Sequence, residues 1–107
     1  MSGFRFMRML VFFDLPTITG EDRRNYRQFR KKLIKNGFIM LQESVYCRMV
    51  TSPSVEASVK KMIQDNKPPK GLVQYLSITE KQFARMEYVV GESKKEVIDS
   101  TESLVIL

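Results

Sequence analysis

Histidine and tryptophan are absent from this chain of 107 residues, and cysteine occurs once. Without histidine, the chain lacks the commonest general base and the commonest side-chain metal ligand. A metal site would therefore have to use oxygen ligands, which suit a hard cation such as magnesium. The single cysteine, Cys47, cannot form an intrachain disulfide, and its apolar neighbours indicate a buried side chain. We therefore expect a cytoplasmic protein.

Long hydrophobic runs are also missing. No apolar stretch approaches the roughly 20 residues that a membrane helix needs, and the first residues do not resemble a signal peptide. We therefore expect no membrane partner. Glycine-rich phosphate loops, internal repeats and Ser/His or Cys/His constellations are absent as well. The length and the apolar fraction of 43% predict one compact domain.

The net charge of +6 is concentrated in the first half of the chain. Residues 1–54 contain ten lysines and arginines against four acidic residues, whereas residues 55–107 contain eight of each. Such an asymmetry indicates that one face of the molecule meets a polyanion.

The chain is organised around the apolar run 9–13, which is followed by Asp14, Leu15 and Pro16. A strand of five consecutive large apolar residues has no polar face, so we expect it to be covered on both sides. Pro16 ends the strand because it cannot donate a ladder hydrogen bond. Asp14 is then either a functional carboxylate at the edge of the sheet or an ordinary turn residue.

A basic helix is expected after a loop at 17–20, from Glu21 to about Asn36, with Gly37 as its stop signal. Tyr26, Phe29 and Leu33 form its apolar stripe. The other face is cationic, so either it is simply solvated or part of it contacts phosphates. The candidate nucleic-acid-binding residues are Arg23, Arg24, Arg27, Lys31 and Lys35, and the alternative cations are Arg5, Arg8 and Lys70.

The rest of the chain predicts two strands at 38–41 and 45–50, a helix starting at Ser52–Pro53, and a strand at 72–78. A short helix is expected after Thr79, and a further strand at 86–90. The order β, α, β, β, α, β predicts an α+β fold, the ferredoxin-like sandwich, as one domain over residues 1–91.

The C-terminal residues 92–107 are expected to form a linker and an additional strand. Leu104, Val105, Ile106 and Leu107 are apolar residues at a chain end, which is normally frayed and polar. A strand added to a sheet edge, of the same chain or of a partner, would cover them. Together with the two-sided strand 9–13, this indicates a homodimer that associates sheet to sheet, with residues 104–107 at its interface.

Four segments in order resemble the CRISPR-associated Cas2 family, the smaller of the two universal CRISPR adaptation proteins. They are the strand ending in Phe-Asp-Leu-Pro, the basic helix ending at 36–38, the Gln-Glu-Ser-Val-Tyr hairpin at 42–46, and the segment 76–83. The segment 79–86, Thr-Glu-Lys-Gln-Phe-Ala-Arg-Met, resembles the type II-A branch of this family.

This resemblance implies a ferredoxin-like homodimer that bridges two dimers of the CRISPR integrase. It would support a short double-stranded DNA, the prospacer, for insertion into the CRISPR array. The family is also described as a magnesium-dependent endonuclease of RNA or duplex DNA. Its metal residue corresponds to Asp14, and the two Asp14 carboxylates of a dimer would share one Mg²⁺.

Three functions remain to be separated. Residues 17–22 lack the arginines that nuclease members tend to carry, and one carboxylate per chain without histidine is a sparse set for hydrolysis. The scaffold is therefore favoured over the endonuclease, in which Asp14 would be catalytic. The third alternative is an RNA-binding module that exposes Phe12, Phe13 and Tyr46 on its strands, although the apolar surroundings indicate that these side chains are buried.

Overall fold

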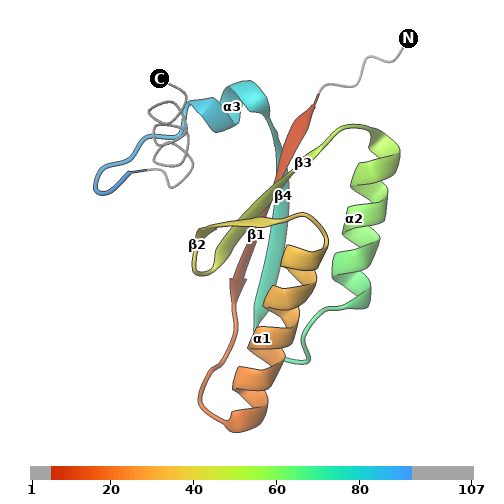
Figure 1. Cartoon of the computed structure of the whole chain (residues 1–107), viewed down its shortest axis with the longest axis vertical. Coiled ribbons are helices and arrows are strands. Elements are labelled where there is room, and N and C mark those ends of the chain that lie inside the picture. The colour runs from red at the N-terminus through yellow and green to blue at the C-terminus, as the bar shows by residue number, and fades with distance from the viewer. Residues whose placement is uncertain (1–5, 93–107) are drawn as a thin grey trace, which may run out of the picture.

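The structure, a computed structural model, describes residues 6–92. Its elements follow the expected order (Figure 1). They are β1 (Met7–Asp14), α1 (Gly20–Lys35), β2 (Ile39–Gln42), β3 (Val45–Val50), α2 (Pro53–Asp65), β4 (Leu72–Thr79) and α3 (Glu80–Ala84). None of the helices among these residues is long and apolar enough to cross a membrane.

The four strands form one antiparallel sheet in the order β2-β3-β1-β4. β1 is central, so that Leu10 lies opposite Cys47 on one side and opposite Leu76 on the other. This order, with both long helices on one face (Figure 1), is the predicted ferredoxin-like sandwich.

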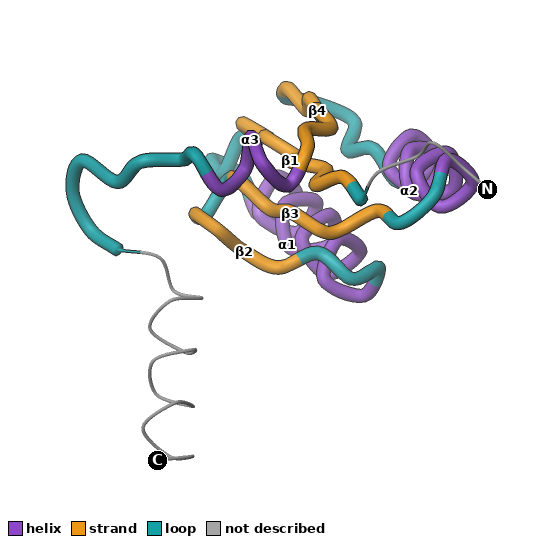
Figure 2. Tube along the Cα trace, turned by 90° about the horizontal axis from the view of Figure 1, so that it is seen from above, coloured by secondary structure: helices purple, strands orange, loops and turns teal. Residues whose placement is uncertain are grey.

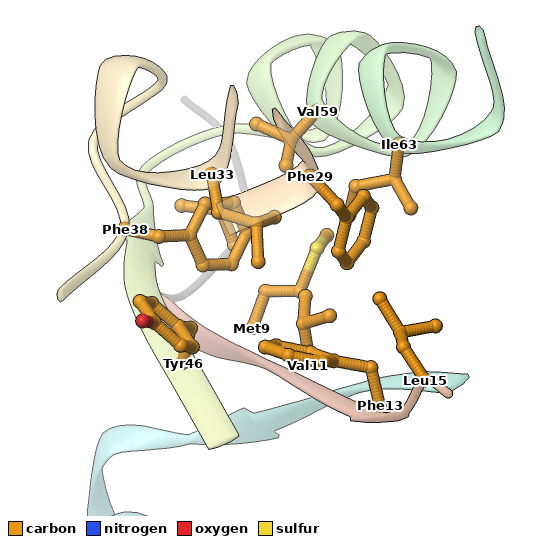
Figure 3. Close-up of a cluster of buried hydrophobic side chains, with 11 residues drawn as sticks. Met9, Val11, Phe13, Leu15, Phe29, Leu33, Phe38, Tyr46, Val59 and Ile63 are labelled. Atoms are coloured by element: carbon orange, nitrogen blue, oxygen red, sulfur yellow. The ribbon is translucent and has the colours of Figure 1, made fainter. Parts of the chain in front are cut away.

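The core lies between the sheet and the two long helices (Figure 3). Met9, Val11 and Phe13 point into it from β1 and meet Phe29 and Leu33 of α1. The ring of Phe13 packs edge-on against Phe29, with 5.3 Å between centroids. Alternation along β1 therefore puts Arg8, Leu10, Phe12 and Asp14 on the opposite face of the sheet.

Both long helices begin at side-chain caps. Thr19 Oγ1 accepts from the Asp22 amide at 2.9 Å, and Asp22 Oδ2 accepts from the Thr19 amide at 3.2 Å. This reciprocal capping box starts α1 inside the segment that the sequence indicated as a loop. At α2, Ser52 Oγ accepts from the Val55 amide and Pro53 occupies the first turn, as expected.

The strand predicted at 86–90 is wrong: these residues form an irregular segment, in which Val89 is 97% exposed. The reason is the direction given by α3, which leads the chain away from the sheet (Figure 2), where these residues have no strand to pair with. The predicted edge strand and interface residues 104–107 lie outside the described residues.

The RNA-binding alternative required exposed aromatic side chains on the strands. Instead, Phe13 and Tyr46 are buried in the core, and Phe12 is half-buried. The Tyr46 hydroxyl accepts a hydrogen bond from Arg30 Nε at 2.6 Å. Cys47 is buried as predicted. The rings of Phe13 and Tyr46 hold the helix layer on the sheet and are not available to stack on bases, whereas Phe12 lies on the opposite face of the sheet.

Candidate metal and nucleic-acid sites

Asp14 is the last residue of β1, and its side chain is exposed at the end of the strand. It pairs with Leu72, the first residue of β4, whereas the register with β3 has already ended at Phe12. Gly71, just before β4, has a φ of +93°, and a Cβ there would lie 2.6 Å from the Asp14 carbonyl oxygen. This close approach requires glycine and fixes the backbone of Asp14, while the carboxylate itself is exposed.

The carboxylates of one chain do not make a metal site by themselves. Among residues 6–92, no group of three or more His, Cys, Asp or Glu side chains could hold an ion. Asp22 is occupied by its cap and lies 3.9 Å from Lys70 Nζ. Asp14 supplies hard oxygen donors of the kind that magnesium prefers, so these residues fit a metal only if a second copy supplies a second carboxylate.

The loop after Asp14 is held by the start of α1. Arg23 Nη1 donates to the carbonyl oxygens of Thr17 and Ile18 at 3.2 and 2.9 Å. The hydrogen bond from the Thr19 amide lowers the pKa of Asp22, and Lys70 lowers it further. Arg23, a predicted phosphate ligand, and Lys70, an alternative one, thus also have structural partners in this loop.

The other predicted cations lie on the exposed surface of α1. Arg24, Arg27, Lys31 and Lys35 are all exposed, and within the described residues none of them takes part in an ion pair. The structure therefore presents the cationic face that the sequence predicted. Lys32 is exposed on the same helix and was given no site role.

The sheet face opposite α1 and α2 is apolar and largely open. Its apolar residues are Leu10, which is buried, and Phe12, Ile39, Met49, Leu72 and Leu76, and the exposed Gln74 lies among them; we call this surface the open face. Leu72, Leu76 and Ile39 are 55%, 53% and 50% exposed. Side chains of this size seldom gather on a surface unless a partner covers them.

One end of the open face is covered by α3. Arg8, which is 8% exposed, points from β1 into an ion pair with Glu80 and lies 4.5 Å from the centre of the Phe83 ring. The hydrogen bond to Glu80 raises the pKa of the Arg8 guanidinium. Arg8 was an alternative phosphate ligand in the sequence, but the structure uses it to hold α3 on the sheet.

Comparisons with known proteins agree on one family. The family described as CRISPR associated protein Cas2 matches residues 7–86. A CRISPR-associated endoribonuclease Cas2 of Treponema denticola is 55% identical over 94% of this chain and 100% of that protein. The protein of the same name from Streptococcus mutans is 45% identical, covering 94% of this chain and 93% of that protein.

The crystal structure of Streptococcus pyogenes Cas2 at pH 6.5 is similar in fold. It has a TM-score of 0.61 and 19% sequence identity, and the match covers 78% of this chain and 99% of that one. This likeness bears on the fold alone. The expected ferredoxin-like architecture is confirmed by it and by the strand order described above.

Proposed function

The chain belongs to the CRISPR-associated Cas2 family, and from this premise we propose that it is a homodimeric scaffold of CRISPR adaptation. It would bridge two dimers of the CRISPR integrase and support a prospacer DNA duplex for insertion into the CRISPR array. The open face carries this proposal, because a sheet with an apolar outer face needs a second layer.

A second copy of the chain is a suitable cover for the open face. Two such faces packed together would bury Leu72 and Leu76 of both copies, in an isologous contact of the commonest kind. β4 is an edge strand, so it can also accept a further strand. We assign that place to the C-terminal residues 104–107, which would cross to the partner from the linker that starts at 92.

The nucleic acid would bind through phosphate contacts. α1 displays exposed cations without ion-pair partners in residues 6–92. Lysine and arginine contacts to the backbone are indifferent to sequence, which suits a protein that handles DNA segments of many sequences.

The alternative function is a metal-dependent endonuclease. The relatives quoted above are named endoribonucleases, and two Asp14 carboxylates brought together in a dimer could hold one Mg²⁺. A bound magnesium ion would act as a Lewis acid on a phosphodiester. Asp14 of each chain would hold that ion, and Gly71 would position both carboxylates by its contact with the Asp14 backbone.

The substitution Asp14→Asn separates the two functions. It keeps the shape of the side chain and removes the charge and the strong metal ligand, so a scaffold should still form dimers, bind DNA and integrate spacers with the integrase. The measurement is spacer integration by the reconstituted proteins, with RNA and DNA cleavage followed in parallel.

Two results bear on the choice. Integration close to that of the wild type, with or without residual cleavage, supports the scaffold. Loss of integration, while dimer formation and DNA affinity are unchanged, would make Asp14 catalytic and overturn our preference.

A further inference from the structure

We propose that Asp22 and Lys70 are positioning residues for Asp14, because together they clamp the loop between α2 and β4 onto the end of β1. The inference rests on the magnesium site proposed for the paired Asp14 carboxylates, and it says what holds each carboxylate in place. The loop consists of residues 66–71, and we call it the clamp loop. It passes α1 and the end of β1 on its way to β4 (Figure 1).

The end of β1 is held differently on its two sides. On the side of β3, the register ends at Phe12, and the Phe13 amide donates to the Ser44 carbonyl oxygen at 3.0 Å. On the side of β4, the register continues to Asp14 itself, which lies opposite Leu72. The place of Asp14 therefore depends on where β4 begins, and hence on the clamp loop that precedes it.

The clamp loop meets Asp14 through its last residue, Gly71. A Cβ on Gly71 would lie 2.6 Å from the Asp14 carbonyl oxygen and 3.1 Å from Leu15 Cα, so the two backbones pack directly against each other. Leu15 is itself buried in the core. The planar peptide group between Asp14 and Leu15 therefore has little room to rotate, and this fixes the direction in which the Asp14 side chain leaves the backbone.

Lys70, the residue before Gly71, ties the clamp loop to α1. Its ammonium nitrogen lies 3.9 Å from Asp22 Oδ1, and the Asp22 side chain is only 8% exposed. Asp22 is held in turn by the capping box, in which its Oδ2 accepts from the Thr19 amide at 3.2 Å. Residues 15–16, the start of α1 and residues 68–70 enclose a space of only about 10 Å³, so these segments pack closely.

A shared ion would make small displacements of Asp14 costly. Mg²⁺ requires nearly ideal octahedral geometry, with its oxygen ligands at about 2.0–2.1 Å. When two carboxylates related by a two-fold axis hold one ion, any displacement in one chain is repeated in the other. We therefore expect the metal affinity of the dimer to respond to the clamp more strongly than the stability of the fold does.

The test measures binding of Mn²⁺ to the full chain by electron paramagnetic resonance, since Mn²⁺ accepts the same oxygen ligands as Mg²⁺. Asp22→Asn keeps an oxygen acceptor for the Thr19 amide but removes the charge that faces Lys70. Lys70→Gln removes the other charge, and a third variant combines both substitutions. The control, Lys61→Gln, removes a lysine of similar exposure from its ion pair with Asp65 on α2. Sedimentation and urea denaturation without metal confirm that the variants keep the assembly state and the stability of the control.

Asp22→Asn and Lys70→Gln should each weaken Mn²⁺ binding by roughly threefold to tenfold, between the effect of an exposed ion pair and that of a direct partner of a metal ligand. The double variant should bind no more weakly than the weaker single variant, because both substitutions break one contact. A role through charge alone would instead give opposite signs, since loss of an anion weakens cation binding and loss of a cation strengthens it. Lys61→Gln should change the affinity by less than about twofold, because its distant exposed charge is screened.

Each contrary result has its own meaning. If the wild type binds no Mn²⁺, or binds it only as well as Asp14→Asn does, the paired-carboxylate site fails and this inference fails with it, while the proposed scaffold stands. If the wild type binds and the two single variants shift in opposite directions, Asp22 and Lys70 act on the ion through charge. If both variants bind as the control does, the clamp loop does not position Asp14. Either of the last two results overturns our inference and leaves the metal site in place.

Discussion

Gly71 packs against the backbone of Asp14, the candidate metal ligand. A Cβ at Gly71 would lie 2.6 Å from the Asp14 carbonyl oxygen and 2.8 Å from Leu15 Cδ2, at a positive φ. The Leu15 methyl group could turn away, but the Asp14 carbonyl oxygen is a backbone atom and Leu15 Cα would also lie only 3.1 Å from the added Cβ. The strand end itself would therefore have to move. Glycine at this position therefore holds the backbone from which the Asp14 carboxylate extends.

The substitution Gly71→Ala should lower the free energy of unfolding by about 1–3 kcal/mol, because it combines backbone strain with this steric overlap. Urea denaturation measures the change. Gly91→Ala is the matched control, since Gly91 has a φ of +86° but no atom within 4 Å of its added Cβ. An equal loss in both variants would show that strain alone matters and that the contact with Asp14 does not.

The structural role of a residue could be predicted from the sequence where one local signal determines it. Pro16 located the end of β1 and hence Asp14. The pair Thr19 and Asp22 is also a local signal, a capping box, but the glycine between them favoured a loop. The partners of Arg8 could not be predicted, because its contact with Glu80 joins residues 72 positions apart.

Among the elements, α3 depends most on a single long-range contact. It has five residues and no buried side chain, so its own hydrogen bonds cannot keep it folded. Its capping box at Thr79 and Gln82 starts the helix, and Arg8 holds it on the sheet through Glu80 and Phe83. α3 in turn directs the residues that follow.

Replacing Glu80 by Gln should loosen α3 without unfolding the sheet. The Arg8 side chain is 10% exposed and would lose its charged partner, but Glu80 is 41% exposed, so we expect a cost of only about 1 kcal/mol. Hydrogen exchange of the amides at 80–85 should become faster, while exchange in β1 stays slow. Lys81→Gln, at an exposed position of the same helix, is the control. Unchanged exchange in α3 would contradict its anchoring by Arg8.

The segment 86–90 is an element that the local sequence pattern could not predict correctly. Apart from Glu87 its residues are apolar or aromatic, and the local pattern alone favoured a fifth strand. A strand needs a neighbour for its backbone groups, however, and the exit from α3 leaves this segment without one in its own chain. The course of the chain after α3 therefore outweighs the strand propensity of these residues.

For the whole molecule, the order of elements was sufficient to predict the ferredoxin-like sandwich, because few topologies connect β, α, β, β, α, β without crossing. The run 9–13 also predicted cover on both faces of β1. α1 and α2 cover one face, and α3 covers only one end of the other. The remaining apolar surface, including Leu72 and Leu76, leads to the central claim that two copies associate through the open face.

Sedimentation velocity of the full chain and of Leu76→Lys at micromolar concentration tests this claim most directly. Leu76 is 53% exposed in the single chain, so lysine there should leave the fold intact but place a charge inside the proposed interface. Lys81→Gln, outside the sheet, is the control. We predict a dimer for the wild type and the control, and a folded monomer for Leu76→Lys. A wild type that sediments as a well-behaved monomer, or a Leu76→Lys variant that remains a dimer of equal affinity, would contradict the account.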